Sequence, residues 1–194
     1  MQTTSNATTT VPAAVNHWAA FKAGQAAERP IVNAHCVQVG IGQLKIGART
    51  DQLQALLGSC VGIAFIWKKR GRCGLAHCLL PDAPQAQDAL SARYVSQAVP
   101  ALLTLLGASE ADYPDIQVVL AGGATMLNAR SSRLQIGQQN IDAARRHLRK
   151  CGLNVQYCRI GGKCGRTLTV DCATSSFIVN EIVTAQPKAA YANA

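Results

Sequence analysis

The chain has 194 residues, of which 48% are hydrophobic, and this size suits one globular domain with a substantial core. No apolar run approaches the length of a membrane span, and Met1 to Val11 lack the basic start and apolar block of a secretory signal, so we expect a cytoplasmic protein with no membrane insertion. The formal net charge of +9 comes from small groups of Lys and Arg without interleaved aromatic residues. This argues against a nucleic-acid partner and leaves a solvated basic face or an acidic protein partner as alternatives.

The first third of the chain combines an extension with short strands. Residues 1–30 are dominated by Thr, Asn, Ala and Gln and are expected to form a flexible N-terminal extension. Residues 31–48 alternate in part, which predicts two short strands with a break near Gly42. The inward positions of these strands would be Val37, Val39 and Ile41. Residues 50–57 are expected to be a connecting segment.

A β-hairpin is predicted next. Residues 60–67 are apolar and partly β-branched or aromatic, as is typical of a buried strand. Residues 68–72 are charged, contain a glycine and are expected to form the turn. The return strand would follow over 73–80 and end at Pro81. Such a hairpin would bring the chain near His77 back alongside the chain near Cys60.

Two helices are predicted in the second half. The first would begin after Ser91 and run to Leu106, with Pro100 as a kink or break and Gly107 as the stop. The second would run over 141–150 with Asn140 as its N-cap, followed by Gly152 as the C′ residue. The predicted strands around them are 116–121, 153–160, 166–172 and 177–183. Residues 185–194 are Ala-rich and are expected to be a mobile tail.

The eight cysteines do not indicate a metal site or disulfides. They contain no C-x-x-C pair, which structural zinc sites generally use. Cys73, His77 and Cys78 supply part of a ligand set, but neighbours on a strand point to opposite faces, so His77 and Cys78 do not easily share one ion. Without an export signal we expect free thiols in a reducing cytosol. We therefore expect no metal and no other cofactor.

Cys60 and His77 are the candidate catalytic pair. A cysteine beside a histidine is the arrangement that makes a sulfur nucleophile near neutral pH. Gly58 and Ser59 precede the cysteine, and a glycine turn lets backbone N–H groups face a substrate oxygen, as an oxyanion hole requires. The alternative is that Cys60 is simply a small buried hydrophobic residue.

Four ordered motifs carry a resemblance to a known family. They are Leu57-Gly58-Ser59-Cys60-Val61, then Ala76-His77-Cys78-Leu79-Leu80-Pro81, then Ala121-Gly122-Gly123-Ala124-Thr125-Met126-Leu127 with Ile136-Gly137-Gln138-Gln139-Asn140, and finally Ile160-Gly161-Gly162-Lys163-Cys164-Gly165-Arg166. In this order and approximate spacing, the chain from about Val37 to Val183 resembles the chemoreceptor glutamine deamidase family, CheD.

The resemblance implies an α+β fold of packed mixed β-sheets flanked by helices, as a single domain over 31–184. It also implies a protein-glutamine glutaminase that converts receptor glutamine side chains to glutamate and releases ammonia, with Cys60 as nucleophile, His77 as base and no cofactor. The implied partners are the cytoplasmic domains of chemoreceptors and a CheC-type phosphatase.

The chain departs from the family at one position. The family commonly has a threonine a few residues before the nucleophile, treated as the third member of the active site. Here Gln54 is the closest positional match, and the nearest threonine is Thr50. Gln54 and Ser59 are therefore the candidate orienting or oxyanion groups. The alternative function is a binding module for receptors or CheC that keeps the fold with little or no catalysis.

Overall fold

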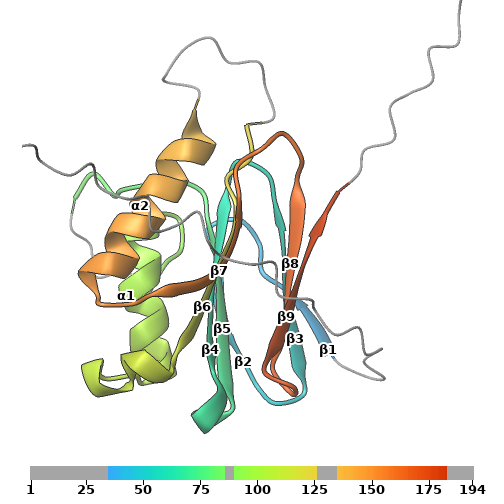
Figure 1. Ribbon diagram of the computed structural model, residues 1–194, viewed down its shortest axis with the longest axis vertical. Coiled ribbons are helices and arrows are strands. Elements are labelled where there is room, and N and C mark those ends of the chain that lie inside the picture. The colour runs from blue at the N-terminus through green and yellow to red at the C-terminus, as the bar shows by residue number, and fades with distance from the viewer. Residues whose placement is uncertain (1–34, 86–89, 126–134, 183–194) are drawn as a thin grey trace, which may run out of the picture.

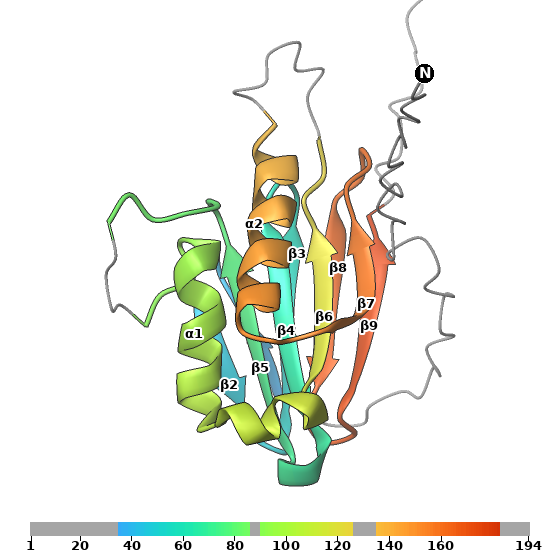
Figure 2. The same cartoon turned by 60° about the vertical axis from the view of Figure 1, so that its left-hand side comes forward.

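The computed structural model of the protein describes residues 35–85, 90–125 and 135–182. These residues form three layers, which Figures 1 and 2 show from two sides: a pair of helices, a five-stranded sheet and a four-stranded sheet. The five-stranded sheet lies in the middle, so its two faces are both covered. The predicted extension over 1–30 and the predicted tail over 185–194 lie outside the described residues.

The five-stranded sheet is built around the predicted hairpin. Its strand order is β2 (Leu44–Gly47), β5 (Arg72–Cys78), β4 (Val61–Trp67), β6 (Gln117–Gly122) and β7 (Val155–Ile160). The 3-10 helix η1 (Lys68–Arg70) makes the hairpin turn between β4 and β5. Every residue of β4 is buried, because β4 pairs with a strand on each side and is covered on both faces. A strand in that position has no polar face, which explains its continuous apolar sequence.

The second sheet contains a strand that the sequence did not predict. Its order is β1 (His35–Gln38), β3 (Asp51–Leu57), β8 (Arg166–Asp171) and β9 (Ser176–Glu181). The expectation that residues 50–57 only connect other elements is wrong, since β3 pairs with β1 and β8 along its length. The burial alternates along β3 as in a half-buried strand: Leu53, Ala55 and Leu57 are buried, while Gln54 and Leu56 between them face outward. Ile41, expected to point inward, is 61% exposed in the turn after β1.

Both α-helices cover the same face of the five-stranded sheet (Figure 1). Helix α1 (Val95–Leu106) continues through Pro100 without a break. Gly107 ends it, as expected, and has a left-handed backbone. Helix α2 (Ile136–Lys150) begins earlier than predicted, so the expectation that Asn140 is its N-cap is wrong. The 3-10 helix η2 (Glu110–Asp115) leads from α1 into β6. Among the described residues, no helix combines the length and the apolar character needed to cross a bilayer.

The two interfaces between the layers form two hydrophobic cores. One lies between the helices and the five-stranded sheet and includes Phe65, Leu102 and Ile141. The other lies between the two sheets and includes Leu57, Leu75 and Leu168. Parallel and antiparallel pairs occur in both sheets. The predicted α+β class with packed mixed sheets is therefore confirmed, with the helices on one side only.

Candidate active site

The hairpin brings Cys60 and His77 to the same end of the five-stranded sheet. Val61 pairs with Cys78 and Gly62 pairs with His77, so Cys60 lies one residue before the paired region. In this register Cys60 and His77 are diagonal neighbours, and such positions are typically about 7–8 Å apart. The register of the predicted hairpin thus places the two candidate residues on adjacent segments of the chain.

The turn before Cys60 is fixed through its carbonyl groups. The Gly58 carbonyl accepts the Ala124 N–H at 2.8 Å, and the Cys60 carbonyl accepts the Gly123 N–H at 2.7 Å. Between them, the Ser59 carbonyl accepts the side-chain amide of Asn140 at 3.1 Å. With three successive carbonyl groups held, the peptide planes of the turn have little freedom to rotate.

A glycine lets β6 approach this turn closely. A Cβ atom on Gly122 would lie 2.4 Å from the Cys60 carbonyl oxygen, and the residue has a φ of 96°, in the left-handed region that favours glycine. The motif that begins at Ile160 lies next to Gly122, because the Gly161 N–H donates to the Gly122 carbonyl at 2.9 Å. The structure therefore gathers the motifs of the sequence around Cys60.

His77 is buried and its tautomer is fixed. The ring has 3% of its surface exposed, and Nδ1 lies 3.0 Å from the Val39 carbonyl oxygen. A carbonyl oxygen only accepts, so Nδ1 carries the proton and Nε2 carries the lone pair. Nε2 is buried and has no hydrogen-bond partner among the described residues. The ring is thus held with a free proton acceptor inside the protein.

Burial favours the neutral form of both candidate groups. Burial lowers the pKa of His77 below its ordinary value, although the bond to Val39 acts in the opposite direction. Burial also raises the pKa of the Cys60 thiol, opposed by its own backbone N–H. Within the described part of the chain, no hydrogen bond joins the thiol to the ring. The arrangement favours a thiol and a neutral imidazole over a preformed thiolate–imidazolium pair.

The structure does not bring Gln54 to this pair. Its side chain lies on the outer face of the four-stranded sheet, where Nε2 donates to Thr169 Oγ1 at 3.0 Å and Oε1 accepts the Gln38 amide at 2.8 Å. An orienting role for Gln54 toward His77 is therefore not supported, because strand alternation turns it away from the sheet interface. The group that orients the ring is a main-chain carbonyl, that of Val39.

Two groups at the site were not identified from the sequence. The sequence does not mark the Val39 carbonyl as part of the site, because every residue type has a main-chain carbonyl. Asn140 was noticed only as a helix cap, yet it is fully buried and binds the turn that precedes Cys60. A polar residue at a buried helical position is the one local sign that points to it.

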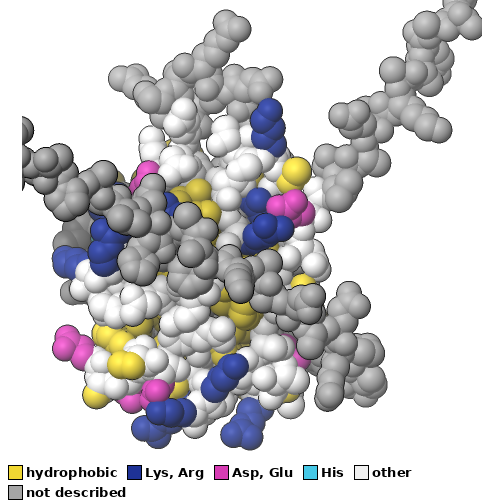
Figure 3. Space-filling view, in the orientation of Figure 1, with side chains coloured by type: hydrophobic (Ala, Val, Ile, Leu, Met, Phe, Trp, Pro, Cys, Tyr) yellow, Lys and Arg dark blue, Asp and Glu magenta, His cyan; other side chains and the backbone are white. Residues whose placement is uncertain are grey.

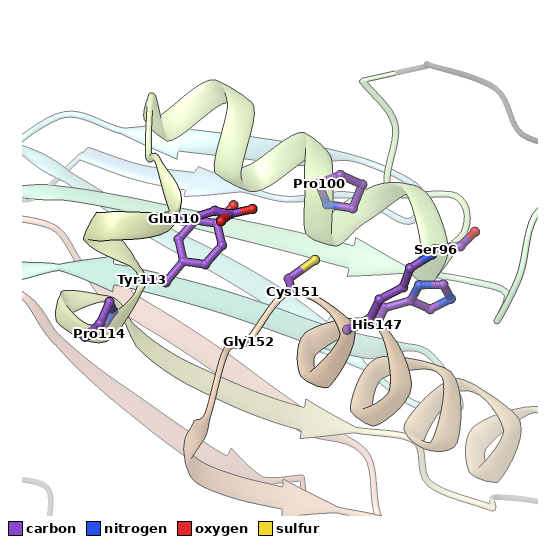
Figure 4. Close-up of a pocket in the computed structure, with 9 residues that line it drawn as sticks. Ser96, Pro100, Glu110, Tyr113, Pro114, His147, Cys151 and Gly152 are labelled. Atoms are coloured by element: carbon purple, nitrogen blue, oxygen red, sulfur yellow. The ribbon is translucent and has the colours of Figure 1, made fainter.

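Other parts of the described surface lack the features of this site. In the described ranges, no three His, Cys, Asp or Glu side chains gather where they would hold one metal ion. A groove of about 680 Å³ lies between α1, α2 and η2, lined by Pro100, Tyr113, His147 and Cys151 among others, and includes none of the predicted site residues (Figure 4). Lys and Arg form several separate groups on the face shown in Figure 3.

Comparisons with known proteins identify the family. The family model described as CheD chemotactic sensory transduction matches residues 79–181, a range that starts just after His77. A probable chemoreceptor glutamine deamidase CheD of Bdellovibrio bacteriovorus is 35% identical over 134 residues, which are 68% of this chain and 86% of that protein. Proteins of the same name from Methanococcus maripaludis and Pyrococcus horikoshii are 33% and 36% identical, each over 75% of this chain and over 94% and 92% of their own lengths. The chain belongs to the CheD family.

Proposed function

We propose that this protein is a chemoreceptor glutamine deamidase, a protein-glutamine glutaminase that hydrolyses glutamine side chains of receptors to glutamate and releases ammonia. Cys60 is the nucleophile and His77 is the general base. The observation that carries the proposal is the buried His77 ring, whose tautomer leaves Nε2 free beside the fixed Cys60 turn. The family name of the relatives supplies the substrate class.

The reaction follows from the neutral state of the two groups. Nε2 of His77 takes the thiol proton as the Cys60 sulfur forms a bond to the side-chain amide carbon of the substrate. The imidazolium then gives that proton to the amide nitrogen, the carbon–nitrogen bond breaks and ammonia leaves. The remaining thioester is hydrolysed when His77 takes a proton from water and returns it to the sulfur, so that glutamate and the free thiol are formed.

The turn supplies candidate donors for the negative charge that develops on the substrate oxygen. Among the described residues, the Ser59 and Cys60 N–H groups donate to no other main-chain carbonyl, whereas all three carbonyls of the turn are bound. Fixed N–H groups beside a nucleophile stabilise an oxyanion without reorganising during the reaction. In this role Ser59 acts through its backbone and not through its hydroxyl.

An exposed apolar side chain near the site supports a protein substrate. Ile41 is 61% exposed and precedes Gly42, whose N–H binds the His77 carbonyl at 2.8 Å. Apolar groups beside a site offer contacts to a protein surface. We also expect this protein to reside in the cytoplasm and to bind a CheC-type phosphatase as a second partner. Co-purification from the cytoplasmic fraction of the native cell tests both expectations.

The deciding experiment measures ammonia release from a purified receptor fragment. Wild-type protein should convert specific glutamines to glutamate, and Cys60→Ala should abolish turnover while leaving the thermal unfolding temperature nearly unchanged. Cys36→Ala is the matched control, because Cys36 is exposed on β1 and lies outside the site. If Cys60→Ala retains wild-type turnover, the assignment of the nucleophile is wrong. If wild-type protein binds the fragment and releases no ammonia, the chain is a binding module.

A further inference from the structure

Asn140 occupies an unusual position for a polar residue. It lies inside α2, and none of its surface is exposed. Its side-chain nitrogen donates to the Ser59 carbonyl at 3.1 Å and to the Leu79 carbonyl at 3.0 Å. Because both partners only accept, the nitrogen and not the oxygen must face them, so the orientation of the amide is determined.

The two carbonyls belong to the two chain segments that carry the candidate catalytic pair. Ser59 immediately precedes Cys60, and Leu79 is two residues after His77. The paired region of β4 and β5 ends at Val61 and Cys78. The next pair in that register would be Cys60 with Leu79, and at this point the Asn140 side chain joins the two segments in place of the sheet ladder.

This replacement has a chemical consequence for the nucleophile. Asn140 fixes the Ser59 carbonyl from the helix side, while the Gly123 and Ala124 N–H groups fix the two neighbouring carbonyls from the β6 side. Within the described ranges, the turn is thus held without a bond from the Cys60 N–H to another main-chain carbonyl. The Asn140 oxygen is buried without a partner in the described residues, so the side chain is not explained as a fully satisfied part of the core.

We propose that Asn140 is a positioning residue that holds the Ser59–Cys60 turn against the His77 strand. The proposal rests on the proposed deamidase function for its effect on turnover. A second consequence does not depend on turnover. The bond from Asn140 keeps the Cys60 thiol buried, and this burial raises the pKa of the thiol.

The test uses Asn140→Ala with two readouts. We expect kcat to fall about 10- to 100-fold with KM little changed, since a misplacement of about 1 Å at a reacting group costs on the order of 100-fold. The rate of Cys60 alkylation, measured by peptide mapping across a pH series, should change in the opposite direction. Release of the turn exposes the thiol, and the thiolate fraction at neutral pH rises about tenfold for each unit by which its pKa falls.

Leu148→Ala is the matched control. Leu148 is buried on the same helix, and its loss leaves a cavity in the core without touching the turn. At a temperature where both variants are folded, it should lower the unfolding temperature and leave kcat and the alkylation profile unchanged. The proposal is overturned if Asn140→Ala keeps kcat within about twofold of wild type and an unchanged profile, or if Leu148→Ala reproduces the same two changes.

Asn140→Asp provides a second variant of nearly the same size. Its carboxylate only accepts, so it would face the two carbonyl oxygens without a donor, and we expect the same pair of changes. The difference from wild type should shrink at lower pH, where the protonated carboxyl donates to one carbonyl. Wild-type kcat and thiol reactivity in this variant at neutral pH would overturn the proposal. Should wild-type protein release no ammonia, the deamidase function fails, and the alkylation profiles alone decide the role of Asn140.

Discussion

Gly137 provides a sharp test of how closely α2 approaches Gly123 and Ala124, whose N–H groups hold the turn before Cys60. It lies in the first turn of α2, and a Cβ atom there would lie 2.5 Å from the Gly123 carbonyl oxygen and 2.8 Å from the Ala124 carbonyl oxygen. In an open helix, Gly→Ala stabilises by about 0.8–1.0 kcal/mol. Here both obstacles are main-chain atoms that cannot rotate away, so α2 must move.

The expected magnitude follows from these two opposed effects. Overpacking of a buried contact costs about 1–3 kcal/mol, and the rigid neighbours place Gly137→Ala in the upper part of that range. After the gain in helix propensity, we expect a net loss of about 1–2 kcal/mol. For a domain of this size, that lowers the unfolding temperature by roughly 2–8 °C.

The same substitution should reduce activity. Gly123 binds the Cys60 carbonyl through its N–H, and α2 carries Asn140, so a shift of the helix reaches the turn from two directions. We expect kcat to fall about 10- to 100-fold in the ammonia-release assay.

Gly152→Ala is the control for a glycine lost from the other end of the helix. A Cβ atom there meets nothing within 4 Å, but the residue has a φ of 69°. The left-handed backbone costs an alanine about 1–2 kcal/mol, so stability should fall by a similar amount while kcat stays at the wild-type value. A Gly137→Ala protein that unfolds at or above the wild-type temperature with full kcat would refute the close approach of α2 to Gly123 and Ala124.

Four other predictions concern pH and single side chains. Because His77 must be neutral to accept a proton and burial lowers its pKa, the acid limb of kcat/KM should lie below about pH 6.5. The lowered pKa of His77 also links protonation to the free energy of unfolding. This contribution is fully present above about pH 6.5 and is lost as the pH falls through the lower folded-state pKa. His77→Gln should therefore remove that part of the acid sensitivity, measured by urea unfolding. Gln54→Ala should keep kcat within about twofold, since its side chain binds only the outer face of the sheet; a large loss would mean that the motif position is catalytic after all. Ile41→Lys should raise KM for a receptor fragment with kcat unchanged, and an unaltered KM would exclude the apolar contact.

The hairpin and the last three strands could be predicted because their signals are local. Residues 61–67 form an uninterrupted apolar run, and the charged turn after them is a strong boundary. Strand β3 escaped prediction although Gln52 and Gln54 alternate with apolar residues, because the exposed Leu56 beside Leu57 breaks the period of two. Its partners, β1 and β8, are distant in sequence, and the pairing that makes it a strand is a property of the folded chain.

The adjacency of Cys60 and His77 could also be predicted, whereas the groups that hold them could not. Residue chemistry and motif order point to these two residues as candidates. Asn140 was assigned as a cap because asparagine is common at helix N-termini. Its actual bonds reach carbonyls 81 and 61 residues away in the sequence. No local pattern reports contacts over such separations, and the same holds for the Val39 carbonyl that fixes the His77 ring.

The complete burial of β4 bears on how long the site persists in solution. A central strand covered on both faces exchanges its amide hydrogens only through openings close to global unfolding, whereas edges such as β2 and β9 open more readily. Cys60 adjoins β4, and His77 lies on its hairpin partner. When the outer strands fray, the β4–β5 hairpin keeps its structure. Cys60 and His77 therefore stay in place until the domain unfolds. The lifetime of the site in a native-state exchange experiment should match that of the folded domain and not that of the loops around it.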